Sequence, residues 1–140
     1  MTPHSFDLRR FTDAQDGTYE YATAELRRGR KTSHWMWFVF PQIAGLGHSD
    51  MSRRYAISSL AEARAYLAHP VLGRRLVECA SILVGLADRT AEQVFGAIDA
   101  QKLRSSMTLF RRADPVEPVF AQVLDRYFDG AEDPATEDRI

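Results

Sequence analysis

A single cysteine, Cys79, is present among the 140 residues, so no internal disulfide can form and no zinc site can be built from paired cysteines. Long apolar runs are missing as well, because no stretch reaches the roughly 20 apolar residues that a membrane-spanning helix needs. The first residues, MTPHSFDLRR, lack the apolar middle of a signal peptide. We therefore expect a protein of a reducing compartment, cytoplasmic and without a membrane partner.

Charge of neither sign is in clear excess. The 18 Lys and Arg residues and the 19 Asp and Glu residues leave a net charge of −1. Proteins that bind nucleic acid along its backbone usually carry a basic excess, so this balance counts against a nucleic-acid partner. With 45% hydrophobic and 26% charged residues the composition is globular, and the length fits one domain.

Runs in which apolar and polar residues alternate, as in strands, are short or absent, whereas apolar residues at helical spacing recur along the chain. We expect an all-α fold, with a single compact domain at residues 1–130 made of about seven helices, several of them short. The acidic end GAEDPATEDRI predicts a flexible acidic tail at residues 131–140. A long central helix is predicted after Pro70, with an apolar face formed by Leu72, Leu76, Cys79, Ala80, Leu83 and Leu86.

Helix boundaries are marked by polar caps and by a glycine. Ser59 with Glu62, and Thr90 with Gln93, have the spacing of capping boxes, in which two side chains satisfy backbone N–H groups at a helix start. Gly96 is predicted to interrupt the helix that begins after Thr90.

The stretch HWMWFVFPQ, residues 34–42, holds both tryptophans of the chain, and Pro41 is predicted to end its helix. On a helix, residues two apart point to nearly opposite sides, so Trp35 and Trp37 should not share a face. One interpretation is a buried core helix. The other is half core and half cavity wall, with one indole offering a stacking face to a base, a nicotinamide or a sugar.

Polar groups accompany these rings. His34, the two indole N–H groups and Gln42 each need a hydrogen-bonding partner if they are buried, which a purely apolar core would not require. His34 is a candidate for catalysis, against the simpler role of a hydrogen-bonded structural histidine. No histidine or carboxylate lies three or four residues from His34, so we expect neither a metal site nor a cofactor.

A glycine-bearing loop, IAGLGHSD, follows the aromatic run. Gly45 and Gly47 either form a tight turn or let backbone N–H groups cradle a phosphate, and Ser49 can cap a turn running toward Tyr55. The basic cluster RRGRK at residues 27–31 either is a solvated helix end or attracts a phosphorylated ligand.

A second polar group lies in AIDAQKLRSSMTLF, residues 97–110. Asp99 and Lys102 have ion-pair spacing on a helix. Ser105 and Ser106 are poor choices for the middle of a helix, because their hydroxyls compete for backbone hydrogen bonds. Locally disfavoured residues are often found at functional sites, although an exposed ion pair beside a core explains the same pattern.

Three segments together, KTSHWMWFVFPQIAGLGHS, YAISSLAEARAYLAHPVLGRRL and VFGAIDAQKLRSSMTLF, resemble the small bacterial and fungal proteins grouped as domain of unknown function family 1810. The resemblance runs from about Leu8 to Gly130 and implies one compact, mostly helical domain with no established biochemical role. The label calpastatin-like, sometimes given to the family, implies a calpain inhibitor. Such inhibitors resemble disordered chains, whereas this chain has the apolar positions for a core.

The chain is also similar to the NADAR group of N-glycosidases, small helical proteins that act on ADP-ribose-type ligands. An early helix with aromatic residues and histidine and a late helix ending in MTLF carry the similarity. It implies hydrolysis of a glycosidic bond, for which a carboxylate must activate water and offset developing positive charge. Ser33–His34 replaces the glutamate–histidine pair of that group, and in the other alignment Glu20 or Glu25 serves as the glutamate.

Two functions follow from these patterns. The first is a small-molecule pocket for a nucleotide or an ADP-ribose-like ligand, with N-glycosidic hydrolysis as its reaction if one is catalysed. The second is a non-enzymatic protein-interaction or structural module, and the oligomeric state stays open. The candidate catalytic residues are Asp99, His34 and Glu20. The candidate ligand-binding residues are Lys31, Trp35, Trp37, Gln42, Gly45, Gly47, Ser49, Arg74, Lys102, Ser105 and Ser106.

Overall fold

The computed structural model describes residues 6–140, in which the chain forms nine helices and no strand. The predicted all-α class is therefore confirmed for this part of the chain. The only extended pairing described there is an isolated parallel bridge between Ile43 and Ile57. The helices are α1 (Arg9–Gln15), α2 (Tyr19–Arg28), α3 (Met36–Val39), α4 (Asp50–Arg54), α5 (Leu60–Ala68), α6 (Leu72–Gly85), α7 (Ala91–Ala113), α8 (Val119–Phe128) and α9 (Pro134–Glu137).

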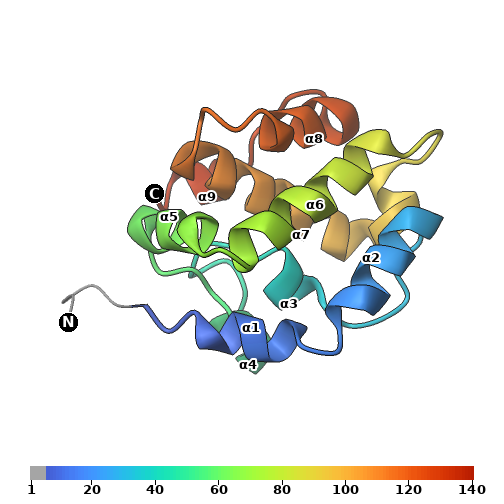
Figure 1. The fold of residues 1–140 in the computed structure, drawn as a ribbon. Helices are drawn as coiled ribbons and strands as arrows, with labels where there is room; N and C mark the ends of the chain where they lie inside the picture. The colour runs from blue at the N-terminus through green and yellow to red at the C-terminus, as the bar shows by residue number, and fades with distance from the viewer. Residues whose placement is uncertain (1–5) are drawn as a thin grey trace.

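The helices pack around one continuous core of buried apolar side chains. α7 packs against α5, α8 and α9, whereas α6 packs against α2, α5 and α8. Figure 1 shows α8 along one edge of the molecule and α1 with α4 along the opposite edge. None of the helices in residues 6–140 combines the length and the apolar character needed to cross a membrane.

Two helices share the centre of the core. α6 is the helix predicted to be central, and it buries its apolar face as expected, Leu86 at its end being partly buried. α7 is longer, and between Leu103 and Phe110 every residue except Arg104 is buried. The core is therefore built on α7 as much as on α6.

Of the two predicted capping boxes, the one at Thr90 is complete and the one at Ser59 is half formed, because the Glu62 carboxylate accepts from the Ser58 N–H in place of the Ser59 N–H. At the start of α7, the Gln93 N–H donates to the Thr90 hydroxyl at 3.1 Å and the Thr90 N–H donates to the Gln93 side chain at 2.8 Å, which completes the capping box. Gly96 has a φ of 79° and a ψ of 166°, so the helix is interrupted at the predicted residue. The kink turns residues 97–113 into a second segment of α7.

The predicted number of about seven helices is too low. α4 has five residues and was expected only as a turn, and α9 has four residues in the segment expected to be flexible. Helices this short show no apolar periodicity, so the sequence pattern misses them. Their starts do carry signals, since Ser49 caps α4 and Asp133 caps α9 just before Pro134.

The aromatic run folds as the single turn α3. Phe40 has a φ of −125° and a ψ of 73°, outside the helical region, as expected for a residue that precedes proline. Trp35 is fully buried, whereas Trp37 is partly exposed. The two indoles have different environments, as predicted, although Trp35 precedes the helix with a φ of −131° and a ψ of 4° and is not part of it.

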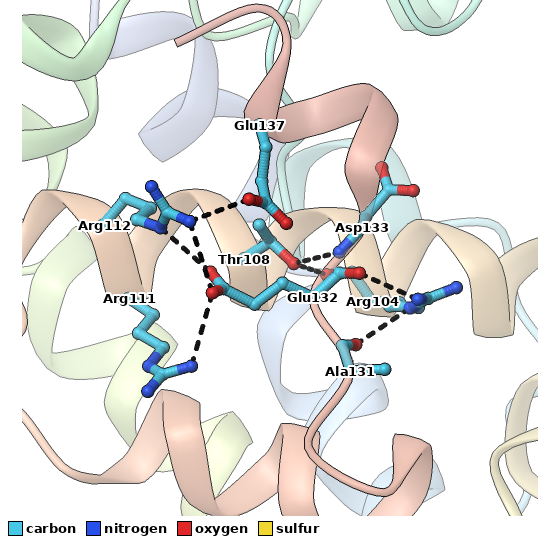
Figure 2. A network of polar contacts seen from close by, with 8 residues as sticks. All are labelled: Arg104, Thr108, Arg111, Arg112, Ala131, Glu132, Asp133 and Glu137. Atoms are coloured by element: carbon cyan, nitrogen blue, oxygen red, sulfur yellow. Dashed lines mark hydrogen bonds and ion pairs between the residues drawn. The ribbon is translucent and has the colours of Figure 1, made fainter.

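Residues 131–140, whose composition predicts a flexible tail, pack against α7. Arg104 donates to two backbone carbonyl oxygens of this segment, at 2.9 and 2.8 Å. The Glu132 carboxylate pairs with Arg111 at 3.5 Å and with Arg112 at 3.0 Å, and Figure 2 shows these contacts together. Acidic residues are typical of solvated chain ends, but here they meet arginines on the neighbouring helix.

Candidate functional site

A groove of about 540 Å³ lies between three segments: residues 42–47, the part of α7 after Gly96, and the start of α9. Small-molecule sites usually occupy roughly 300–1,000 Å³, so the groove has a suitable size. Its wall combines apolar side chains with amides, a hydroxyl, a carboxylate and an amine. The wall residues are Gln42, Leu46, Gly47, Ala97, Ile98, Gln101, Lys102, Ser105, Asp133 and Ala135.

The cationic side of the groove is held by ion pairs and by two indole rings. Lys102 Nζ lies 3.5 Å from one carboxylate oxygen of Asp99, and Lys31 Nζ lies 2.9 Å from the other. Lys102 Nζ also lies 4.9 Å from the ring centre of Trp37. Lys31 Nζ lies 5.3 Å from the ring centre of Trp35, and both distances are within cation–π range. Because two cations share one carboxylate, the cluster carries net positive charge beside the groove.

Asp133 closes the groove on the α9 side and is only 4% exposed. Its Oδ1 atom accepts a hydrogen bond from Gln101 at 3.1 Å, and Oδ2 accepts one from the Ser105 hydroxyl at 2.9 Å. Oδ2 also accepts from the backbone N–H of Thr136 at 3.1 Å and from its hydroxyl at 2.6 Å. The Asp133 N–H donates to Thr108 at 2.9 Å (Figure 2). Asp133 therefore fixes this wall, and both of its oxygens are occupied.

A smaller hollow of about 150 Å³ adjoins the groove and shares Gln42 and Gly47 with it. Trp37 and Arg53 contribute to its wall. The indole N–H of Trp37 is buried and has no hydrogen-bond acceptor in the described part of the chain. The loop that carries Gln42 and Gly47 thus separates two adjoining spaces of different size.

Two glycines let this loop pass close to its neighbours. Gly45 has a φ of +97°, which a residue with a side chain rarely adopts. A Cβ atom at Gly47 would lie 2.4 Å from Ser52 Oγ, so a larger residue would force the loop away from α4. A Cβ atom at Gly45 would lie 3.3 Å from the guanidinium group of Arg139, which places that group against the loop.

Glu25 of α2 anchors the segment that leads to the tryptophans. Its Oε1 atom accepts from the backbone N–H groups of Thr32 and Ser33, at 2.7 and 2.8 Å, and from the Trp35 indole at 3.0 Å. Its Oε2 atom accepts from the Ser33 hydroxyl at 2.6 Å. Burial alone would raise the pKa of Glu25, but these four donors outweigh it and lower the pKa to about 2. Glu25 is therefore ionised and saturated with donors, which fits a structural role.

The fold and the groove can be compared with known proteins. A family model described as "Protein of unknown function (DUF1810)" matches residues 5–140. The chain belongs to this family. The resemblance to family 1810 is thereby confirmed.

This DUF1810 chain is similar to a solved structure, that of the conserved hypothetical protein Rv1873 from Mycobacterium tuberculosis. The two sequences are 50% identical, the match covers 95% of each chain, and the TM-score is 0.94. No protein with a curated description matches the chain.

Many of the predicted site residues of this DUF1810 protein lie close together. Asp99 and Lys102 form the ion pair that their spacing predicts, and Lys31 joins them from the connection between α2 and α3. The predicted residues that line the groove or the hollow are Trp37, Gln42, Gly45, Gly47, Lys102 and Ser105.

Other predicted residues lie elsewhere. Trp35 is fully buried and its N–H is bound to Glu25, so it presents no face to a ligand. Ser106 is also fully buried, and its hydroxyl has no partner within residues 6–140. In that same part of the chain, no group of His, Cys, Asp or Glu side chains is arranged to hold a metal ion. The predicted residues that are exposed and outside the groove wall are His34, Glu20, Ser49 and Arg74.

Several wall residues were not singled out from the sequence, among them Asp133, Ile98 and Arg53. Asp133 had a readable signal, because an aspartate followed by proline is typical of a helix start. Ile98 and Arg53 had none, since their roles depend on how α7 and α4 meet the loop at residues 42–47.

Proposed function

We propose that this protein binds a nucleotide-like small molecule of the ADP-ribose type in the groove between α7, α9 and residues 42–47. The observation that carries the proposal is a groove of about 540 Å³ whose wall holds one cation, Lys102, and one carboxylate, Asp133, which already accepts hydrogen bonds from the protein. Lys102 lies in that wall, and its partner Asp99 is shared with Lys31, so positive charge remains for a phosphate.

The rest of the wall suits the other parts of such a ligand. Leu46 and Ile98 offer apolar surface for a sugar or the face of a base, and Ile98 is 76% exposed, which is high for a large apolar side chain. Gln42 offers both an amide donor and an acceptor for hydroxyl groups or base edges. Pockets of this kind combine an apolar lining with a few polar groups that orient the ligand.

The alternative function, a protein-interaction module, would require a continuous apolar surface patch. The large hydrophobic side chains that are exposed in residues 6–140 are Tyr21, Ile98 and Val116. They lie on α2, on α7 and in the connection between α7 and α8, and Ile98 belongs to the groove. This distribution favours ligand binding.

Hydrolysis of the glycosidic C–N bond of the ligand, as in NADAR-type N-glycosidases, is the reaction within this proposal. Water attacks the anomeric carbon, the C–N bond breaks, and the departing base takes up a proton. Asp99 is the acid–base candidate, because its side chain is partly exposed, whereas Asp133 is buried and accepts hydrogen bonds from four donors. Asp99 precedes the groove residues Gln101 and Lys102 by less than one helical turn.

Calorimetric titration with adenosine, AMP, ADP and ADP-ribose at constant ionic strength tests binding. Lys102→Met keeps the aliphatic stem and removes the charge, so it should weaken the phosphate-bearing ligands about tenfold or more. Arg74→Met makes the matching change on the exposed side of α6 and should leave affinity unchanged. If none of the four compounds binds the wild-type protein, the proposal is wrong.

Release of free base from AMP and NAD, followed by chromatography, tests hydrolysis separately. The wild-type protein should release base, and Asp99→Asn should release at least about a hundredfold less, as expected for loss of general acid–base catalysis. Binding without base release would restrict the function to recognition.

A further inference from the structure

The hollow beside the groove has the composition of an anion site. Its wall holds one cation, Arg53, and no carboxylate, and Arg53 lies 3.9 Å from the exposed carboxylate of Asp50 outside the wall. Ser52 and Gln42 add a hydroxyl and an amide, both able to donate hydrogen bonds. The hollow has a volume of about 150 Å³, which is enough for a few water molecules at about 30 Å³ each and also for one phosphate group.

The indole of Trp37 supplies the observation that points to a ligand. Its Nε1 atom is buried without an acceptor in residues 6–140, although buried polar groups almost always have a hydrogen-bond partner. An indole N–H can only donate, so the partner that would satisfy it must be an acceptor. Trp37 belongs to the wall of the hollow. Its N–H has almost no accessible surface in the structure, so a phosphate oxygen in the hollow would bond to it after a small movement of the ring.

The neighbouring charges agree with this assignment. The Arg139 guanidinium group lies against Gly45, which is itself part of the hollow wall. On the other side of the loop, Lys102 reaches over the face of the Trp37 ring. Cations therefore lie on both sides of the loop that separates the hollow from the groove, and phosphate binding commonly uses such groups.

We infer that the hollow lined by Trp37, Gln42 and Arg53 holds a phosphate group of the ligand whose remainder lies in the groove. The inference rests on the proposed function, because it places one end of the proposed ligand. Gln42 and Gly47 line both spaces, so a single molecule can extend from one into the other. The ligand class is thereby narrowed to molecules with a terminal or bridging phosphate next to a planar or sugar-like part.

Two substitutions and a control test this placement. Trp37→Phe keeps an aromatic ring and removes the N–H group, and Arg53→Gln removes the charge of an exposed side chain. Arg27→Gln makes the same change of charge on the exposed end of α2, outside both spaces. Adenosine, AMP, ADP and inorganic pyrophosphate are titrated by calorimetry at constant ionic strength, and circular dichroism verifies that each variant is folded.

We expect ADP to bind the wild-type protein at least about tenfold more tightly than adenosine. Trp37→Phe and Arg53→Gln should remove most of this difference in affinity between ADP and adenosine, without changing the affinity for adenosine itself. Arg27→Gln should leave the difference unchanged. If adenosine and ADP bind equally tightly, or if ADP still binds more tightly than adenosine in both variants, the phosphate site is wrong, while the proposal of nucleotide binding is unaffected. Binding of pyrophosphate alone, lost in Arg53→Gln, would support the site and reject the proposed function. If no probe binds, both are rejected.

Discussion

Glu25 couples the stability of this fold to pH through four hydrogen bonds to one buried carboxylate. Glu25→Gln keeps the shape of the side chain and removes its charge. The pKa of Glu25 is about 2 in the folded protein, against an ordinary value of 4.5. At about 1.4 kcal/mol for each tenfold change in an equilibrium constant, this difference corresponds to about 3 kcal/mol of folding free energy.

The sign follows from the direction of the pKa change. Because the pKa is lower in the folded chain, the contribution is fully present above about pH 4.5 and is lost as the pH falls toward 2. Urea unfolding, followed by tryptophan fluorescence, should therefore show Glu25→Gln to be less stable than the wild type by about 3 kcal/mol at pH 7. The difference should become steadily smaller below pH 4.5.

Glu20→Gln is the matched control on the same helix. Glu20 is exposed, so its substitution should change the free energy of unfolding by less than about 0.5 kcal/mol at any pH. A loss for Glu25→Gln that is as large at pH 3 as at pH 7 would refute the reasoning, because it would show that ionisation of Glu25 is not coupled to folding.

Two further substitutions test the packing. A Cβ atom at Gly73 would lie 2.0 Å from a backbone carbonyl oxygen of α5, so Gly73→Ala should lower the free energy of unfolding by about 2 kcal/mol or more. A Cβ atom at Gly85 would meet open space, so Gly85→Ala should be neutral or stabilise the fold by up to about 1 kcal/mol. Equal changes in melting temperature for Gly73→Ala and Gly85→Ala would contradict the close approach of Gly73 to α5. Asp133→Ala removes the acceptor for several buried donors, so it should lower the free energy of unfolding in urea by about 2–3 kcal/mol and should also weaken ligand binding. Asp138 is exposed, so Asp138→Ala should change neither quantity.

The sequence predicts those parts of the fold that depend on local physics. The cap at Thr90 and the break at Gly96 were both readable, because each follows from the hydrogen bonds or the backbone freedom of neighbouring residues. The different environments of Trp35 and Trp37 agree with the prediction, but the reason differs, because Trp35 precedes α3 with a φ of −131° and is not part of the helix. Which indole would be buried was not readable, since that is decided by Glu25, ten residues away in the chain.

The candidate site was only partly predictable, because its parts meet through tertiary structure. Lys102 and Ser105 stood out as polar residues on a helix, and both line the groove. Asp133 was hidden by an acidic composition that usually marks a solvated end, and its role depends on side chains of α7. His34 stood out equally well by residue type, yet it is exposed outside the groove wall.

The distribution of the groove wall along the chain has a consequence for folding kinetics. Residues 42–47 and 133–135 can form opposite sides of one space only after the intervening helices have docked. Contacts between distant segments close large loops, and such contacts generally slow the formation of the structures that depend on them. In a refolding experiment, the burial of Trp35 would therefore follow the formation of the core, while the recovery of ligand binding would follow the docking of α9.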